Sequence, residues 1–171
     1  MRVLYYKSMK KTNAMRILDS AHISYGTTSY DDDGEHELER GAAESIAAKL
    51  GIDPHIVFKT IVMRTEAKEL CVFCQSAVHE INLKKARAAA GAKEISPVKP
   101  DELLALTGYV RGGCSPLGMK RQFRTFVDSK ALEYEKIYIS AGVRGEQIII
   151  APGDLVKAAK AEVCDLILEE S

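Results

Sequence analysis

A glycine-rich stretch, GYVRGGCSPLGMK at residues 108–120, combines residue types that could do chemistry. Gly112 and Gly113 permit positive φ and a close approach of the main chain to a ligand. Successive N–H groups in such a turn can point at a carbonyl or an oxyanion. Ser115 and Pro116 would fix the turn. Taken alone, the stretch favours a tight turn between strands.

Two familiar motifs do not fit this stretch. The spacing from Gly113 to Gly118 matches a phosphate-binding loop, but Met119 stands where lysine is needed and Lys120 stands where serine or threonine would bind magnesium. The Gly-x-Ser-x-Gly order of a nucleophile elbow is not met around Ser115. We therefore expect neither a nucleotide-binding loop nor a serine hydrolase.

Lys59 is the second candidate because it lies in a hydrophobic strand pattern, HIVFKTIVMR. On alternating pleats it shares one face with Val57, Ile61 and Met63, whereas Thr60 points to the other face. An inward lysine is costly unless it meets an anion, a carbonyl or water, so Lys59 is a site candidate on physical grounds. The alternative is an edge-strand lysine that opposes aggregation.

Ser140 is the third candidate, in the stretch IYISAGVRGEQIIIAPGDL. It ends a predicted strand at a glycine-containing turn, where side chains can line the mouth of a cavity. Arg144, in the same turn, could contact a phosphate or face solvent. The sequence alone favours a solvated hairpin tip slightly.

The four cysteines predict neither a disulfide nor a metal site. Cys71 and Cys74 are three residues apart in a strand pattern, so their side chains point to opposite faces about 10 Å apart, beyond disulfide reach. A zinc site would need a second pair of ligands, which His79 alone does not supply. We expect buried structural thiols and no metal.

The composition fits one domain without a polybasic tail. The 171 residues are 46% hydrophobic, and Lys plus Arg and Asp plus Glu both count 24, so any nucleic-acid affinity must be local or shared with a partner. No long apolar run or signal-peptide pattern is present, which predicts a cytoplasmic protein with no membrane span. The methionine at position 9 suggests that residues 1–8 are an N-terminal extension and residues 9–171 the domain.

Hydrophobic periodicity and turn residues predict helices and strands interspersed along the chain. Helices are expected at 10–21, 38–50, 82–90, 100–106 and 152–161, with a short helical turn after Asp53. Strands are expected at 22–30, 57–64, 69–76, 122–128, 136–141, 147–151 and 163–168, with an acidic loop at 31–37. Because most strands follow one another through short turns, we predict a mixed, largely antiparallel sheet or a partly closed barrel.

Three stretches in this order, VFKTIV, GYVRGGCSPLG and YISAGVRGEQIIIAPGDLVK, resemble the YbaK/EbsC family of aminoacyl-tRNA deacylases. Within it they look like the YbaK branch, the Cys-tRNA(Pro) deacylases. The resemblance covers residues 10–168. It implies a single α/β domain with a mixed sheet curled into a partial barrel and surrounding helices, like the editing domain of bacterial prolyl-tRNA synthetases.

The resemblance also implies roles for individual residues. Lys59 and Gly112 would be catalytic, Lys59 through its ammonium and Gly112 through an N–H offered to the ester carbonyl. The implied substrate-binding residues are Tyr30, Thr60, Gly113, Ser115, Ser140 and Gln147. Gln147 departs from the family pattern, because an acidic residue is expected there.

The implied reaction is deacylation of mischarged Cys-tRNA(Pro), with Cys-tRNA(Cys) as an additional candidate substrate. The thiol of the substrate would attack its own ester while the protein orients and polarises it, so no cofactor is expected. Aminoacyl-tRNA and prolyl-tRNA synthetase are the expected partners. The alternatives are a deacylase for another mischarged tRNA such as Ala-tRNA(Pro), and a non-catalytic module that binds aminoacyl-tRNA or a synthetase.

Overall fold

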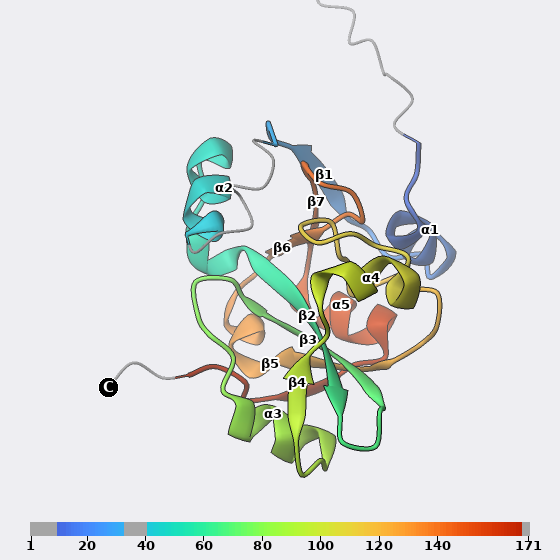
Figure 1. Cartoon of the computed structure of the whole chain (residues 1–171). Helices are drawn as coiled ribbons and strands as arrows, with labels where there is room; N and C mark the ends of the chain where they lie inside the picture. Colours follow the sequence, from blue (N-terminus) through green and yellow to red (C-terminus); the bar gives the residue numbers. More distant parts are fainter. Residues whose placement is uncertain (1–9, 33–40, 169–171) are drawn as a thin grey trace, which may run out of the picture.

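The computed structural model describes residues 10–32 and 41–168, which form helices around two β-sheets (Figure 1). The helices are α1 (Asn13–Ser20), α2 (Ala42–Leu50), α3 (Leu83–Ala90), α4 (Pro100–Thr107) and α5 (Pro152–Ala159), with short 3-10 helices η2 (Pro54–Ile56) and η3 (Ser129–Glu133). The strands are β1 (Gly26–Ser29), β2 (Phe58–Thr65), β3 (Leu70–Ser76), β4 (Ile95–Pro97), β5 (Arg124–Asp128), β6 (Ile137–Ser140), β7 (Glu146–Ile150) and β8 (Glu162–Cys164).

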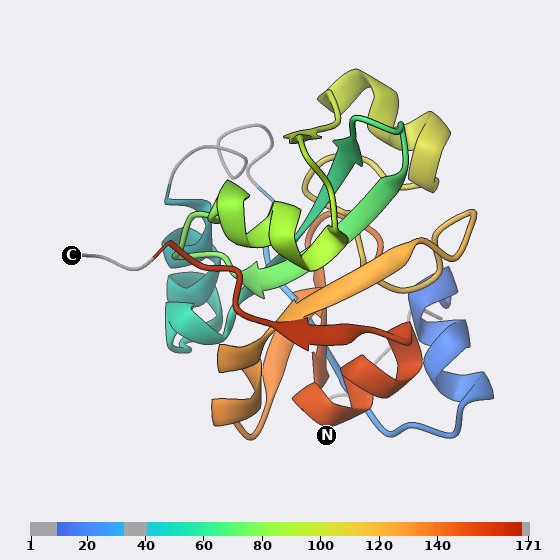
Figure 2. The ribbon, with the colours of Figure 1, turned by 90° about the horizontal axis from the view of Figure 1, so that it is seen from below.

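The strands divide into a five-stranded and a three-stranded sheet. The larger has the order β4-β2-β3-β5-β8, in which β4, β2 and β3 are antiparallel while β5 and β8 each run parallel to the strand before them in this order. Figure 2 shows β3, β5 and β8 side by side. The smaller, β1-β7-β6, is wholly antiparallel. The predicted α/β fold with a mixed sheet is confirmed, but the strands form two sheets and do not close into a barrel.

The two sheets meet along the outer edge of β2. An isolated parallel bridge joins Val57 to Tyr138 of β6. Farther along, the Val98 N–H donates to the Val62 carbonyl at 3.0 Å, and β4 pairs with β2 from Met63 onward. Between these contacts no described strand pairs with the outer edge of β2 over residues 58–61. The chain just before β2 is therefore linked to the smaller sheet, the second half of β2 is paired within the larger sheet, and a gap opens between these two contacts.

Apolar side chains fill both faces of the larger sheet. One cluster packs α1 and α5 against β6 and β7, and includes Met15, Leu18, Ile137, Ile148 and Leu155. The opposite cluster lies under α3 and includes Met63, Phe73, Ala86, Phe126 and Leu166. The Phe73 and Phe126 rings are stacked with centroids 5.1 Å apart. Burial of these side chains fixes the orientation of β2 and β3, and with it the orientation of the residues at the gap.

The cysteines lie as the strand pattern predicts. Cys71 and Cys74 are fully buried, and they belong to different apolar clusters because they face opposite sides of β3. Both thiols are free. Burial raises the pKa of Cys74 to about 12, as expected for an inert structural thiol.

Most of the predicted elements are present, with shorter bounds. The predicted helix at 82–90 is α3, whose N-terminal N–H groups of Lys84 and Lys85 are capped by the Asn82 side chain. The predicted strand at 163–168 is interrupted: β8 ends at Cys164, and a separate bridge pairs Ile81 with Ile167. The sequence analysis missed β4 and η3, which are too short to show a period.

Several expectations concern residues outside the described ranges. They are the extension at 1–8, most of the acidic loop at 31–37, and the start of the helix predicted at 38–50. The described helix α2 begins at Ala42, after Gly41 in the left-handed conformation. None of the helices in residues 10–32 and 41–168 is long and apolar enough to cross a membrane.

The glycine loop docks on the start of α1 through Gly118. This residue has φ of +79°, and a Cβ built on it would lie 2.8 Å from the Asn13 carbonyl carbon and 2.9 Å from the Ala14 nitrogen. Nearby, the Tyr109 hydroxyl donates to the Leu117 carbonyl at 2.7 Å. Only glycine combines this backbone conformation with so close an approach.

Substitution of Gly118 tests this docking. We expect Gly118→Ala to lower the free energy of unfolding by about 3 kcal/mol, since left-handed strain and a backbone clash add together. Gly51→Ala is the matched control, because Gly51 also has positive φ (+68°) but has no atom within 4 Å of its Cβ position. It should lose only about 1 kcal/mol. Urea unfolding of both variants measures the difference, and equal losses would contradict the docking.

Candidate functional site

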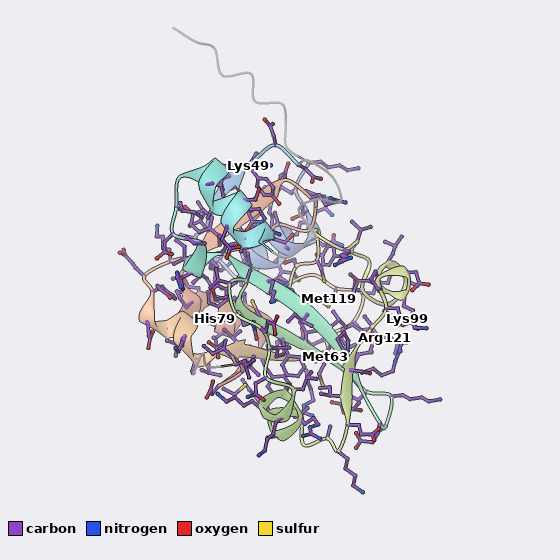
Figure 3. All side chains as sticks on the ribbon, turned by 60° about the vertical axis from the view of Figure 1, so that its left-hand side comes forward. Lys49, Met63, His79, Lys99, Met119 and Arg121 are labelled. Atoms are coloured by element: carbon purple, nitrogen blue, oxygen red, sulfur yellow. The ribbon has the colours of Figure 1, made fainter. Side chains whose placement is uncertain are left out.

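A groove of about 1040 Å³ opens at the gap between the two sheets. Its walls come from α2, the outer edge of β2, the turn after β3, the start of α4 and the glycine loop. Six predicted site residues line it: Tyr30, Lys59, Thr60, Gly112, Ser140 and Gln147. Gly113 and Ser115, which were also predicted, do not line it. Figure 3 shows this region, with Lys49 of α2 and Met119 of the glycine loop on one side of β2 in this view and His79 of the turn after β3 on the other.

Lys59 is half-buried in the wall formed by β2. It shares the face of Ile61 and Met63, as the alternation predicted, and lies directly opposite Gln75 of β3. Burial lowers the pKa of Lys59 from its ordinary value, and the carboxylate of Glu80 partly opposes this shift. A lysine in this position is a cation whose proton is held less tightly than in water.

Thr60 offers the groove its main chain. Its side chain makes a hydrogen bond with the thiol of Cys74, away from Lys59. Main-chain groups alternate between the two edges of a strand, and the Val62 carbonyl bonds Val98 on the outer edge. Thr60 is two residues before Val62, so its N–H and C=O also point to the outer edge, where β2 has no described strand partner. Lys59 thus supplies its side chain to the groove, whereas Thr60 supplies its main-chain N–H and C=O.

The adjacent glycines Gly112 and Gly113 differ in conformation and surroundings. Gly112 has φ of +84° and lines the groove, as expected. Gly113 does not have positive φ, contrary to the expectation, and its N–H already donates to the Val110 carbonyl at 3.0 Å. A Cβ on Gly113 would lie 3.1 Å from the Arg144 nitrogen, so glycine is needed there for close packing against the next turn. Gly112 is therefore the glycine of this pair that can offer an N–H to a ligand.

Ser115 stabilises the turn and does not face the groove. It is fully buried, and its hydroxyl accepts a hydrogen bond from the Leu117 N–H at 3.2 Å. This is the turn-fixing role that the sequence suggested, but it places the side chain away from the groove lining. The neighbouring Cys114 does line the groove, and burial raises the pKa of its thiol to about 12. Such a thiol is not a nucleophile near neutral pH.

Ser140 and Gln147 are cross-strand neighbours on the small sheet. Gln147 pairs with Ser140 on one side and with Thr28 on the other, which puts three polar side chains in a row. The Ser140 hydroxyl accepts from the Gly142 N–H at 3.2 Å. Gln147 is only 5% exposed, and its Oε1 accepts no hydrogen bond from the residues that the structure describes. A ligand donor at this oxygen would relieve a desolvation cost of about 1–3 kcal/mol.

Tyr30 is held at the rim by neighbours from distant parts of the chain. Its N–H donates to the Gly145 carbonyl at 2.9 Å, and the Lys49 ammonium lies 5.8 Å from its ring centroid. Arg144 forms an ion pair with Asp32 at 2.9 Å. This pairing answers the question that the sequence left open for Arg144, because the guanidinium binds a carboxylate of the protein.

Sequence reasoning missed several groove residues. Glu44, His79, Glu80 and Arg111 line it, and they come from α2, the turn after β3 and the glycine loop. Each is an ordinary polar residue in a turn or on a helix face, and no spacing distinguishes them. The antiparallel pairing of β2 with β3 places the end of β3 beside Lys59. His79 and Glu80, in the turn that follows β3, reach the site for this reason.

Comparison with known families identifies this arrangement. Residues 37–158 match the family model described as the aminoacyl-tRNA editing domain. The chain belongs to this family. The recognition made from the three sequence stretches is therefore confirmed.

Relatives of this editing domain include free-standing and synthetase-borne proteins. A protein of Enterococcus faecalis named as a candidate Cys-tRNA(Pro)/Cys-tRNA(Cys) deacylase, EbsC, is 35% identical over 164 residues, covering 96% of this chain and 98% of the relative. The proline–tRNA ligase of Bacillus licheniformis is 29% identical over 85 residues, 50% of this chain and 15% of the ligase. A crystal structure described as a candidate trans-editing enzyme for prolyl tRNA synthetase matches the fold with a TM-score of 0.78 and 21% identity, covering 92% of this chain and 96% of that chain.

The partial burial of Lys59 has a measurable effect on stability. We expect Lys59→Met to raise the free energy of unfolding at neutral pH, because the lowered pKa means that the folded state holds the proton less tightly than the unfolded state. The advantage should shrink as the pH rises toward 10.5, the ordinary value, since Lys59 of the wild type then loses its proton in the folded state first. Urea unfolding across this pH range measures it.

The matched control for this experiment is Lys84→Met on the exposed face of α3. Its stability should change by less than about 0.5 kcal/mol, and without the same dependence on pH. A Lys59→Met variant that is less stable than the wild type at neutral pH would contradict the lowered pKa.

Proposed function

We propose that this editing domain deacylates mischarged Cys-tRNA(Pro), with Cys-tRNA(Cys) as a second candidate substrate. The observation that carries the proposal is the convergence on one groove of Lys59, the main chain of Gly112 and the unsatisfied amide oxygen of Gln147. A cation and a main-chain donor can polarise an ester carbonyl, and a buried acceptor can hold a donor group of the substrate. The names of the relatives supply the substrate class.

The groove suits the 3′ end of a charged tRNA. Its volume of about 1040 Å³ lies just above the roughly 300–1,000 Å³ that small-ligand sites occupy. That is room for an aminoacyl group together with its terminal adenosine. In the proposed pose Lys59 contacts the adenosine or the aminoacyl carbonyl, while Ser140 and Gln147 bound the aminoacyl end. Tyr30 closes the rim, and Thr60 contributes main-chain groups.

The proposed chemistry uses the nucleophile that the substrate brings. The cysteine thiol attacks its own ester carbonyl, a C–S bond forms, and the C–O bond to the ribose breaks. The thiol proton passes to the departing ribose hydroxyl, which leaves free tRNA and a cysteine thiolactone. Holding thiol and carbonyl in a near-attack geometry lowers the barrier, and Lys59 and the Gly112 N–H stabilise the oxyanion. The poorly acidic Cys114 thiol has no part in this reaction.

Editing of this kind is needed because selective binding by the synthetase has a limit. Cysteine and proline are similar in size, and a synthetase pocket cannot strongly reject a side chain that fits within it. The chain has a net charge of zero, which favours a partner that already holds the tRNA. We propose prolyl-tRNA synthetase as that partner. A cytoplasmic location belongs to the same proposal, because charged tRNA is used there.

A panel of charged tRNAs tests the reaction. Release of labelled cysteine from Cys-tRNA(Pro) and Cys-tRNA(Cys) should be fast, while Ala-tRNA(Pro) and Pro-tRNA(Pro) should persist. We expect Lys59→Ala to lower kcat/KM by about 100-fold, in line with the loss of one group that stabilises an oxyanion. Lys84→Ala, on the exposed face of α3, is the control with unchanged rate.

Each other outcome of the panel selects a different function. Release of alanine alone would replace the proposed specificity with that of an Ala-tRNA(Pro) deacylase. No turnover on any member, with retained tRNA binding, would favour a non-catalytic module. Detection of the thiolactone product by mass spectrometry separates thiol-assisted deacylation from direct attack by water.

The partnership is tested by adding prolyl-tRNA synthetase to the assay. We expect the synthetase to lower the KM for Cys-tRNA(Pro) and to leave kcat nearly unchanged, because it supplies tRNA binding and no chemistry. A synthetase of unrelated specificity is the control. Equal KM values with and without prolyl-tRNA synthetase would remove the need for the partner.

A further inference from the structure

Gln75 occupies an unusual position behind Lys59. It is 0% exposed and lies directly opposite Lys59 in the antiparallel pairing of β2 with β3. Its Nε2 donates to the His79 carbonyl at 2.9 Å. Its Oε1 is buried and accepts no hydrogen bond from the residues that the structure describes. A glutamine at this position therefore has one end anchored and the other end without a described donor.

The cross-strand geometry points to one side chain that could bring a donor to this oxygen, although no such hydrogen bond is present among the described residues. Side chains that face each other in an antiparallel pair lie on the same side of the sheet, with Cβ atoms about 4.5–5.5 Å apart. Val57, Ile61 and Met63, which share the Lys59 face nearby, are apolar and their side chains donate nothing. Lys59 is thus the side chain of its strand that can bring hydrogen-bond donors to Gln75. An unsatisfied buried amide oxygen costs about 1–3 kcal/mol, which gives the ammonium a reason to stay near it.

We propose that Gln75 is a positioning residue for Lys59: its side-chain oxygen attracts the ammonium, and its bond to the turn after β3 sets the Glu80 carboxylate beside the same ammonium. The first part concerns Lys59 itself. The effect on catalysis rests on the proposed function.

The turn that carries Glu80 is fixed from two directions. Gln75 holds the His79 carbonyl, one residue before Glu80. On the other side the Leu168 N–H donates to the Glu80 carbonyl at 2.9 Å, and Ile81 bridges to Ile167. The turn cannot drift away from β2 without breaking these contacts. The main chain of Glu80 is therefore held near Lys59, and its exposed carboxylate acts on the ammonium from there.

Among the charged groups around the groove, Glu80 is the one that acts on the pKa of Lys59. Besides Lys59, the acidic and basic side chains that line it are Glu44 of α2, His79 and Glu80 of the turn, and Arg111 of the glycine loop. Glu80 raises the pKa of Lys59, whereas burial lowers it more strongly. A neutral acceptor on the same face, such as the Gln75 oxygen, favours the ammonium without adding a second buried charge.

Titration of Lys59 by NMR tests the inference without any tRNA. In Gln75→Leu, which removes the oxygen, the Lys59 pKa should fall by about one unit relative to the wild type. In Gln75→Glu, which places a carboxylate opposite the ammonium, it should rise by about one unit or more. A residue that served packing alone would not move the titration in opposite directions.

Ser76→Ala is the matched control. Ser76 is the next residue of β3, is also buried, and also has a side-chain oxygen without a described partner, but it faces the other side of the strand opposite Phe58. Its substitution should leave the Lys59 titration unchanged. If Gln75→Leu fails to fold, Gln75→Met, which keeps the chain length without the oxygen, takes its place. An unmoved Lys59 titration in folded Gln75 variants would overturn the proposal.

Kinetics then separate this inference from the proposed function. In the deacylation assay we expect Gln75→Leu to lower kcat about tenfold with little change in KM, and the pH dependence of kcat to move in the same direction as the Lys59 titration. If the titration moves and no tRNA is deacylated by any variant or by the wild type, the proposed function fails and the positioning of Lys59 stands. If the wild type is active and the titration does not move, the proposed function stands and the positioning of Lys59 by Gln75 fails.

Discussion

The site depends on one interruption in strand pairing. Just before β2, Val57 bridges to β6, and the outer edge of β2 bonds Val98 at Val62 and pairs with β4 from Met63 onward, so the residues between face a groove instead of a strand. Unpaired main chain inside a protein is normally costly, so such an edge persists where water or a ligand can reach it. The break supplies main-chain groups at Thr60 and a wall for Lys59, and the glycine loop closes the far side.

The surrounding structure has to resist closure of this gap. The cluster around Phe73 and Phe126 holds β2 and β3 from the side of α3, and a second cluster holds the small sheet against α1 and α5. Gly118 ties the glycine loop to α1 through a contact too close for any side chain. The groove is therefore built between rigid parts, which is the condition for holding an ester in a near-attack geometry.

The sequence predicts the site residues whose role depends on their neighbours along the chain. Lys59 interrupts an apolar alternation and Gly112 lies in a turn that needs positive φ, so both are recognisable from the sequence alone. The family resemblance also implied Gly113 and Ser115 as site residues, but Gly113 packs against the turn at Arg144 and Ser115 accepts from the buried Leu117 N–H. Gln75 and Glu80 could not be found at all, since their relation to Lys59 exists only through the register of β2 with β3. The same lack of long-range information hid the division into two sheets.

The charges at the rim explain why a neutral domain would need help with a polyanion. Arg144 is committed to Asp32, and the Lys49 ammonium lies near the face of Tyr30, so both cations help to position the rim. Within the groove Lys59 is matched by Glu80, and Gln147 stands as a neutral residue where related sequences are expected to carry an acid. These pairings suit recognition of an ester and its neighbouring groups more than a grip on many phosphates, which each require an exposed cation. On the proposed function, an editing site of this kind would gain selectivity from its interior and leave most of the tRNA to the proposed partner.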